Sequence, residues 1–185
     1  GLGRHWHFWA LNGWIAAGLI YVVLLFFTPQ WRRLVPTSWE IFPDAWKAAM
    51  SYLHFQIPPE ANPFNAVQQL SYFFVVFILA PFQIVTGIVM SPALAARFPW
   101  FPKIFGGRQS ARSLHFIGMI LFCAFIVVHV SMVIAHGFGY EMAKIVLGGA
   151  EHSHALSTTI GLSGIGAVIL LNIWITWYSL RQPFK

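Results

Sequence analysis

The sequence contains few charged residues and almost no cysteine, and both scarcities exclude classes of protein. Charged residues make up 9% of the 185 residues and hydrophobic residues 58%, which is typical of an integral membrane protein rather than a soluble domain. The lone cysteine, Cys123, can form neither an internal disulfide nor a cysteine metal site. The absence of a CxxCH motif argues against covalently attached haem.

Acidic residues are scarcer still, since 5 Asp and Glu stand against 11 Lys and Arg, for a net charge of +6. The basic residues lie in short loops beside apolar runs, so their excess indicates membrane topology and not nucleic acid binding. The chain also lacks a first methionine and a recognisable signal peptide. It begins Gly-Leu-Gly, and we therefore expect an incomplete or processed chain.

Long apolar runs predict an all-α fold, an integral membrane helical bundle with four transmembrane helices in a single domain over residues 1–185. The segment at about 38–55 predicts a short amphipathic helix in the membrane interface. Pro81 is expected to kink the second span. Segments 91–107 and 136–151 are expected to be loops. The four spans are expected at about residues 5–27, 65–90, 112–136 and 154–180.

Two histidines interrupt the third span, His115 and His129, fourteen residues apart. In a helix they lie roughly 40° apart on one face and about 21 Å apart along the axis. Polar residues inside a membrane helix are costly and usually functional, and neutral imidazole is the commonest metal ligand. The pair therefore indicates a helix that carries two haems at two depths. The alternative is that each histidine only hydrogen-bonds a neighbouring helix.

The first span offers a partner for His115. His5 and His7 lie about 200° apart around the helix, so only one can face a given neighbour, and we choose His7. Four alternating spans make the first and third parallel, and His7 and His115 each fall within the first turn of their helix. They therefore lie at similar depth, as a bis-histidine haem requires of two imidazoles from different helices.

No histidine within another span lies level with His129. Its partner must come from His152 or His154 with some distortion, from another chain, or from a segment outside this sequence. His54, at the end of the interfacial segment, is expected to be a surface histidine.

A glycine and several arginines accompany the histidines. Gly18 lies eleven residues after His7, in nearly the same direction and about 16 Å deeper. It leaves room for a flat ligand, or for ordinary close packing of helices. Arginine pairs well with carboxylates, so Arg4, Arg108 and Arg112 are candidates to hold haem propionates. The alternative for these arginines is anchoring at the membrane interface.

The basic residues divide unequally between the two faces of the membrane. The face with both termini and the 91–112 loop holds seven of them, which places the termini in the cytoplasm unless some of the arginines serve propionates. The seven are Arg4, Arg97, Lys103, Arg108, Arg112, Arg181 and Lys185. The other face holds Arg32, Arg33, Lys47, Lys144 and all five acidic residues.

The sequence resembles the cytochrome b membrane subunits of bacterial respiratory oxidoreductases, which anchor nickel-iron hydrogenases, formate dehydrogenases and thiosulfate reductase-like enzymes. The resemblance covers roughly residues 4–136, and its most specific part is the histidine pair of the third span. The stretches that carry it are WHFWALNGWIAAGLIY (6–21), NAVQQLSYFFVVF (65–77) and FGGRQSARSLHFIGMILFCAFIVVHV (105–130).

The resemblance implies transmembrane electron transfer by b-type haems between a peripheral redox subunit (iron–sulfur, molybdenum or cytochrome) and the membrane quinone pool. The chain would then be an electron-transfer subunit, not a catalytic one, in the bacterial inner membrane. His7 and His115 would share one haem b. His129 would pair with a histidine on a preceding helix that this sequence lacks, so a second haem depends on a ligand from elsewhere. The family topology would also place Gly1 on the extracytoplasmic side.

Two other functions remain open. A pigment-binding or accessory subunit of a photosynthetic or respiratory complex would use single histidines on chlorin magnesium. A cofactor-free scaffold or transporter subunit would use the histidines for folding alone, although a transporter is expected to have inverted repeats, which we do not find in the sequence.

Overall fold

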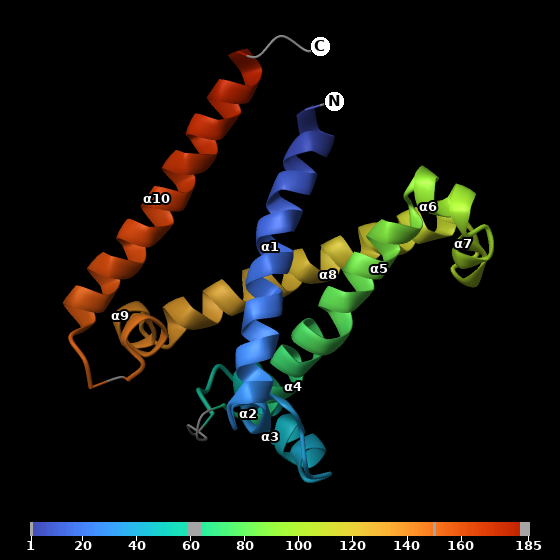
Figure 1. Cartoon of the computed structure of the whole chain (residues 1–185). Helices are drawn as coiled ribbons and strands as arrows, with labels where there is room; N and C mark the ends of the chain where they lie inside the picture. Colours follow the sequence, from blue (N-terminus) through green and yellow to red (C-terminus); the bar gives the residue numbers. More distant parts are fainter. Residues whose placement is uncertain (1, 59–63, 150, 182–185) are drawn as a thin grey trace. The chain divides into compact units, whose positions relative to one another are not determined.

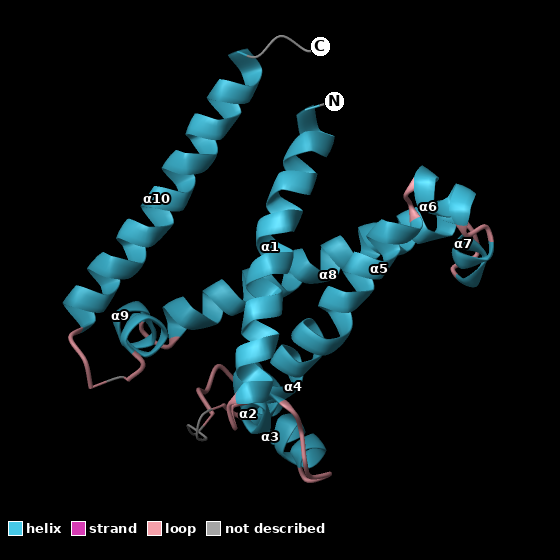
Figure 2. Ribbon diagram, viewed as in Figure 1, coloured by secondary structure: helices cyan, strands magenta, loops and turns pink. Residues whose placement is uncertain are grey.

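The computed structural model describes residues 2–58, 64–149 and 151–181, and over these ranges the chain is helical without a strand (Figure 2). The all-α prediction is confirmed. In order along the chain (Figure 1), the elements are α1 (Leu2–Phe27), α2 (Trp31–Leu34), α3 (Ile41–Leu53), α4 (Ala66–Phe73), the π-helix η1 (Phe74–Leu79), α5 (Ala80–Val89), α6 (Pro92–Arg97), α7 (Trp100–Ile104), α8 (Arg108–Ala135), α9 (Phe138–Met142), the π-helix η2 (Ala143–Leu147) and α10 (His154–Arg181).

Among the described residues, four helices are long and apolar enough to cross a membrane: α1, the continuous run from α4 through η1 to α5, α8 and α10. Their large apolar side chains are mostly exposed, as in Leu19 (62%), Val127 (66%) and Leu170 (67%). Apolar surface of this extent is unfavourable in water and is what a lipid-facing helix presents. The four expected spans agree with these helices to within a few residues, and the chain is an integral membrane protein.

The chain divides into two compact units, Gly1–Phe122 and Cys123–Lys185, and each is described by itself. Helix α8 contributes its first part to the first unit and its remainder to the second. The assignment of residues 1–185 to a single domain stays a prediction. The predicted membrane topology includes Gly1 and Lys185, which lie outside the described residues.

In the first unit, aromatic rings connect α1 to its neighbours. Trp14 meets Phe122 of α8 edge-on, with ring centroids 5.9 Å apart. Nearer the end of α1, Phe26 meets Phe77 of η1 at 6.1 Å. These contacts join the first span to the second and third at different depths, within the unit that also contains His7 and His115.

The start of the second span is tied to helix α3, whose expected place in the membrane interface stays a prediction. Asn65 and Gln68 form a capping box, in which each side chain accepts a hydrogen bond at 3.0 Å from the other's backbone N–H. The Asn65 amide also donates to the hydroxyl of Tyr52 in α3 at 2.8 Å. The expected amphipathic helix is therefore present as α3, and a buried polar contact holds it against α4.

Pro81 changes the hydrogen bonding of the second span. It stands in the first turn of α5, directly after the π-helix η1. Proline has no N–H and its ring crowds the carbonyl four residues earlier. A π-helical turn is one way for a membrane helix to accommodate this within its own backbone.

Both long connections expected as loops contain short helices, so those two expectations were wrong. In the first connection, Ser91 precedes α6, whose first residue is Pro92, a position that proline favours. In the second, Gly137 has φ +103°, which turns the chain between α8 and α9. Helices of one turn lack the long apolar period that reveals a membrane span in sequence.

In the second unit, α9 and η2 pack against α10. The packing depends on small residues. A Cβ added at Gly139 would lie 3.3 Å from Cβ of His154, and one at Gly161 would lie 2.9 Å from the Met142 sulfur. Glycine lets the helix backbones approach closely here, as it commonly does in membrane proteins.

Candidate metal centre

The first unit brings together the imidazoles of His7 and His115, from two different spans. Because α1 begins at Leu2 and α8 at Arg108, His7 lies in the second turn of its helix and His115 in the third, so the expectation that both lie in the first turn was wrong. Their ring centroids are 6.1 Å apart and their planes are inclined at 77°. His5, two residues earlier, is exposed. The choice of His7 over His5 as the partner of His115 thus agrees with the observed ring contact.

The separation of the rings suits a single metal ion between them. Imidazole nitrogen binds a first-row metal at about 2.0–2.1 Å and the ring centre lies roughly 1.2 Å beyond, so two axial rings have centres about 6.4 Å apart. The observed 6.1 Å differs from this by a few tenths of an ångström. In the part of the chain that the structure describes, no group of three or more His, Cys, Asp or Glu is placed to hold a metal ion. Two imidazoles with a planar macrocycle between them fit this donor set.

A threonine from the second span holds the His115 ring. Thr86 is 0% exposed, and its Oγ1 lies 3.0 Å from Nδ1 of His115. The hydroxyl donates to the carbonyl of Phe82 at 2.8 Å, one turn earlier on α5. Since the hydroxyl proton is used there, Oγ1 accepts from the Nδ1–H of His115. We therefore assign the tautomer that leaves the Nε2 lone pair of His115 free for a metal.

Gly87 lies beside Thr86 and provides the space for the same ring. A Cβ at position 87 would stand 3.3 Å from Cε1 of His115, closer than most side chains tolerate. One helical turn further along α8, Gly118 contacts Phe82 and Gln83 in the same way, and an added Cβ there would collide with the Gln83 carboxamide. Oε1 of Gln83 is buried and has no hydrogen-bond partner among the described residues.

Sequence analysis missed Thr86, Gly87, Gln83 and Gly118. The second span carries no histidine, and a threonine or glycine in a membrane helix is common. The usable signal was polarity: Gln83 and Thr86 are three residues apart, so they share one face of an otherwise apolar helix.

The other predicted site residues are placed as follows. A Cβ at Gly18 would meet nothing within 4 Å, so this side of α1 is open. Arg4, Arg108 and Arg112 are exposed. Arg108 donates to the Met90 carbonyl at 3.1 Å, and Arg112 donates to Oε1 of Gln109 at 3.2 Å. Their role toward propionates stays a prediction.

His129 belongs to the second unit, where its ring stacks on Phe125 with centroids 5.4 Å apart and planes at 11°. His154 lies edge-on to Tyr140 at 6.2 Å, and His152 is exposed beside Glu151. The structure thus places the three imidazoles against different neighbours. His54 is exposed, with Nδ1 2.7 Å from the Met50 carbonyl.

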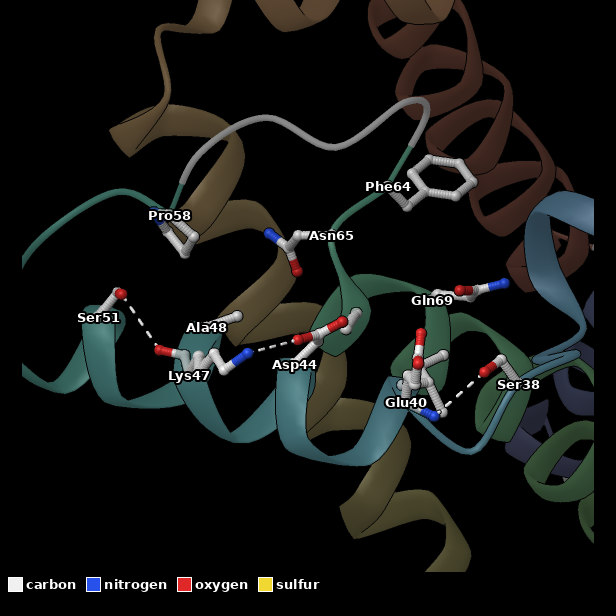
Figure 3. A pocket seen from close by; sticks show the side chains of 12 residues that line it. Ser38, Glu40, Asp44, Lys47, Ala48, Ser51, Pro58, Phe64, Asn65 and Gln69 are labelled. Carbon is white, nitrogen blue, oxygen red and sulfur yellow. Dashed lines mark hydrogen bonds and ion pairs between the residues drawn. The ribbon is translucent and has the colours of Figure 1, made fainter.

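A pocket of about 490 Å³ opens between α3 and the start of α4 (Figure 3). Lys47 pairs with Asp44 at 2.9 Å on its rim, where both side chains are largely exposed. None of the predicted site residues lines it. The lining residues are Ser38, Glu40, Ile41, Asp44, Lys47, Ala48, Ser51, Pro58, Phe64, Asn65, Ala66 and Gln69.

Comparison with known proteins gives two matches. The profile of a family described as prokaryotic cytochrome b561 matches residues 1–148. A putative protein-methionine-sulfoxide reductase subunit, YedZ1 of Azospira oryzae, is 32% identical over 135 residues, which are 69% of this chain and 63% of that protein. The chain therefore spans somewhat less than two thirds of that relative's length. No solved structure matches the chain.

Proposed function

The chain belongs to the prokaryotic cytochrome b561 family, and we propose from this that His7 of α1 and His115 of α8 hold one haem b between them. Family membership makes the chain a haem b protein of membrane electron transport. The observation that carries the assignment is the 6.1 Å separation of the two rings. Its support is the buried hydroxyl of Thr86 on Nδ1 of His115, which leaves Nε2 of that ring available.

Bound haem supplies a one-electron carrier, and the residues of this chain supply its ligands, its position and its surroundings. His7 and His115 would hold the iron near one end of the spans. Apolar side chains such as Phe8 and Phe82 lie nearby, which lowers the local dielectric. Arg4, Arg108 and Arg112 stand at the same end of their helices, where propionates would meet water and basic side chains. Gly18 leaves an open side on α1 for a flat ligand.

We propose His129 as a ligand of a second haem, about 21 Å further along α8. Its stacking on Phe125 gives the ring a defined orientation. The other ligand would come from a segment outside this sequence or from another chain. The site on His7 and His115 is complete within this chain, so the chain accounts for one haem by itself and for two when a fourth histidine is supplied.

The partner in electron transfer is a peripheral redox subunit. The similarity to a putative protein-methionine-sulfoxide reductase subunit favours a catalytic subunit that reduces oxidised methionine, and an iron–sulfur, molybdenum or cytochrome subunit is the broader class. Quinol in the membrane would be the electron source, and the bacterial inner membrane the location. Purification of the complex from a bacterial membrane, with its subunits identified by mass spectrometry, tests these assignments.

The first prediction concerns the haem ligands. His7→Ala and His115→Ala should each remove the haem that the wild-type chain binds, because one imidazole is lost from the pair. The measurement is the haem content per chain, from the pyridine haemochrome of purified protein. The reduced protein should also have an α band at about 560 nm, which chlorins do not give.

His5→Ala is the matched control, since His5 is exposed two residues from His7 on the same helix. It should retain the wild-type haem content. Full haem content in both the His7 and the His115 variants would show that the assignment is wrong.

A further inference from the structure

We propose that Thr86 is a positioning residue of the haem site: its hydroxyl accepts the Nδ1–H of His115, fixes the ring with Nε2 toward the iron, and lowers the reduction potential. The proposal rests on the proposed function, since it takes His115 as an axial ligand. It assigns a role to α5, a helix without histidine.

The contact is a buried one between two spans. Thr86 of α5 is 0% exposed, and His115 of α8 is partly buried. The Oγ1···Nδ1 distance is 3.0 Å, within the range of a good hydrogen bond. In a region without water such a bond has no competing partner, so the ring keeps one orientation.

The direction of the hydrogen bond follows from the other partners of the hydroxyl. Thr86 Oγ1 lies 2.8 Å from the carbonyl of Phe82 and 3.2 Å from that of Gln83, both on its own helix. A carbonyl accepts only, so the hydroxyl proton is directed to one of them. With its proton directed there, Oγ1 faces the ring as an acceptor and requires an N–H at Nδ1 of His115.

Gly87 also helps to position the His115 ring, because it leaves the space that the ring occupies. The added Cβ at 3.3 Å from Cε1 of His115 would have to displace the ring or the helix by a few tenths of an ångström. Thr86 and Gly87 together act on two adjacent atoms of one imidazole, Nδ1 and Cε1. His7 has a different setting, because its ring meets the rings of Phe8 and His115 and its side chain is exposed.

A hydrogen bond from the distal N–H makes the ligating nitrogen a stronger donor. A stronger donor favours the oxidised iron over the reduced iron, and so lowers the midpoint potential. Removing the hydroxyl should therefore shift the potential to a more positive value. Outer-shell partners of this kind typically change metal affinity by about 10–100-fold.

The test compares Thr86→Val with Thr86→Ser in the full chain. Valine preserves the shape of the side chain and removes the hydroxyl, whereas serine retains the hydroxyl. Thr159→Val is the matched control, since Thr159 makes the same bond to a carbonyl one turn earlier, at 2.8 Å, on the exposed side of α10. The measurements are haem content and the midpoint potential in a redox titration.

Thr86→Val should raise the ratio of reduced to oxidised haem at a fixed potential by about tenfold, which for one electron is about 59 mV. Thr86→Ser and Thr159→Val should remain at the wild-type potential. Equal potentials in Thr86→Val, Thr159→Val and wild type would overturn the proposal, and so would an equal shift in the valine and serine variants at position 86.

If Thr86→Val loses its haem, retention in Thr86→Ser supports the proposal and loss in both variants overturns it.

The tautomer of His115 gives a readout without haem, by ¹⁵N NMR of histidine-labelled protein. The Nδ1–H form should dominate in wild type and decline in Thr86→Val. Haem retained in both His7→Ala and His115→Ala would instead defeat the proposed function itself.

Discussion

At the scale of single residues, the site depends on small side chains as much as on histidines. A methyl group added at Gly118 of α8 would lie 2.8 Å from Cδ of Gln83 and 3.4 Å from Cε1 of Phe82 on α5, so the Gln83 side chain would have to move. Three residues earlier on the same helix, His115 bonds to Thr86. Contacts on one face of α8 therefore determine both how the two helices approach and where the imidazole lies.

Gly118→Ala should destabilise the protein by about 1–3 kcal/mol, the usual cost of placing an extra carbon in a closely packed site. Thermal unfolding of purified protein in detergent measures the effect. Gly166→Ala is the control, because a Cβ at Gly166 would meet nothing within 4 Å. Gln83→Ala should relieve part of the loss in the double variant, and equal stability of the two alanine variants would contradict the account.

At the scale of elements, helix α3 packs against the start of the second span, and one residue takes part in both the cap and the contact. Asn65 is 8% exposed and caps α4, and its amide also donates to Tyr52 of α3. A capping asparagine satisfies a backbone N–H that the helix cannot satisfy itself.

Asn65→Ala should lower the free energy of unfolding by about 1 kcal/mol through loss of the cap. Asn65→Ser should retain most of that stability, because serine also caps a helix well. The part that is lost is the hydrogen bond to Tyr52, which a serine side chain cannot reach. Asn172→Ala is the control, since Asn172 is exposed and its side-chain amide donates to the Val168 carbonyl of its own helix. An Asn65 variant as stable as the Asn172 variant in chemical denaturation would refute a role for the cap.

The four spans were predictable because an apolar run of about twenty residues has few structural solutions. The helices α6, α7 and α9 were not, because each is about one turn long and its apolar period is too short to recognise. The kink expected at Pro81 stays a prediction. The sequence did not predict the π-helix just before it, since this depends on how the backbone redistributes its hydrogen bonds.

Within the site, equal depth on parallel spans was enough to expect His7 beside His115, and the rings are adjacent. Their service as haem ligands stays a prediction. Thr86 and Gly87 could not be inferred from sequence, because their contact with His115 depends on how α5 rotates and where it meets α8. Periodicity gives the faces of one helix but not the crossing of two.

At the scale of the whole molecule, the two proposed haem sites lie on α8 but in different units of the chain. His115 contacts residues of α1 and α5, whereas His129 stacks on Phe125 of its own helix. Sites roughly 21 Å apart along one helix are expected to respond largely independently to substitution.

His129→Ala should therefore leave the haem of His7 and His115 in place, with its potential unchanged within error. In a preparation that holds two haems per chain, the content should fall to one. Redox titration and pyridine haemochrome measurement of this variant check both points. Simultaneous loss of the haem at His7 and His115 would contradict independence of the two sites.

The axial ligation of the haem tests the account most directly, and near-infrared magnetic circular dichroism of the oxidised protein reports it. The measurement compares wild type, His7→Ala and His5→Ala in the same detergent. We predict a bis-histidine signal in wild type and in His5→Ala, and its loss for one haem per chain in His7→Ala. An undiminished bis-histidine signal in His7→Ala would contradict the account.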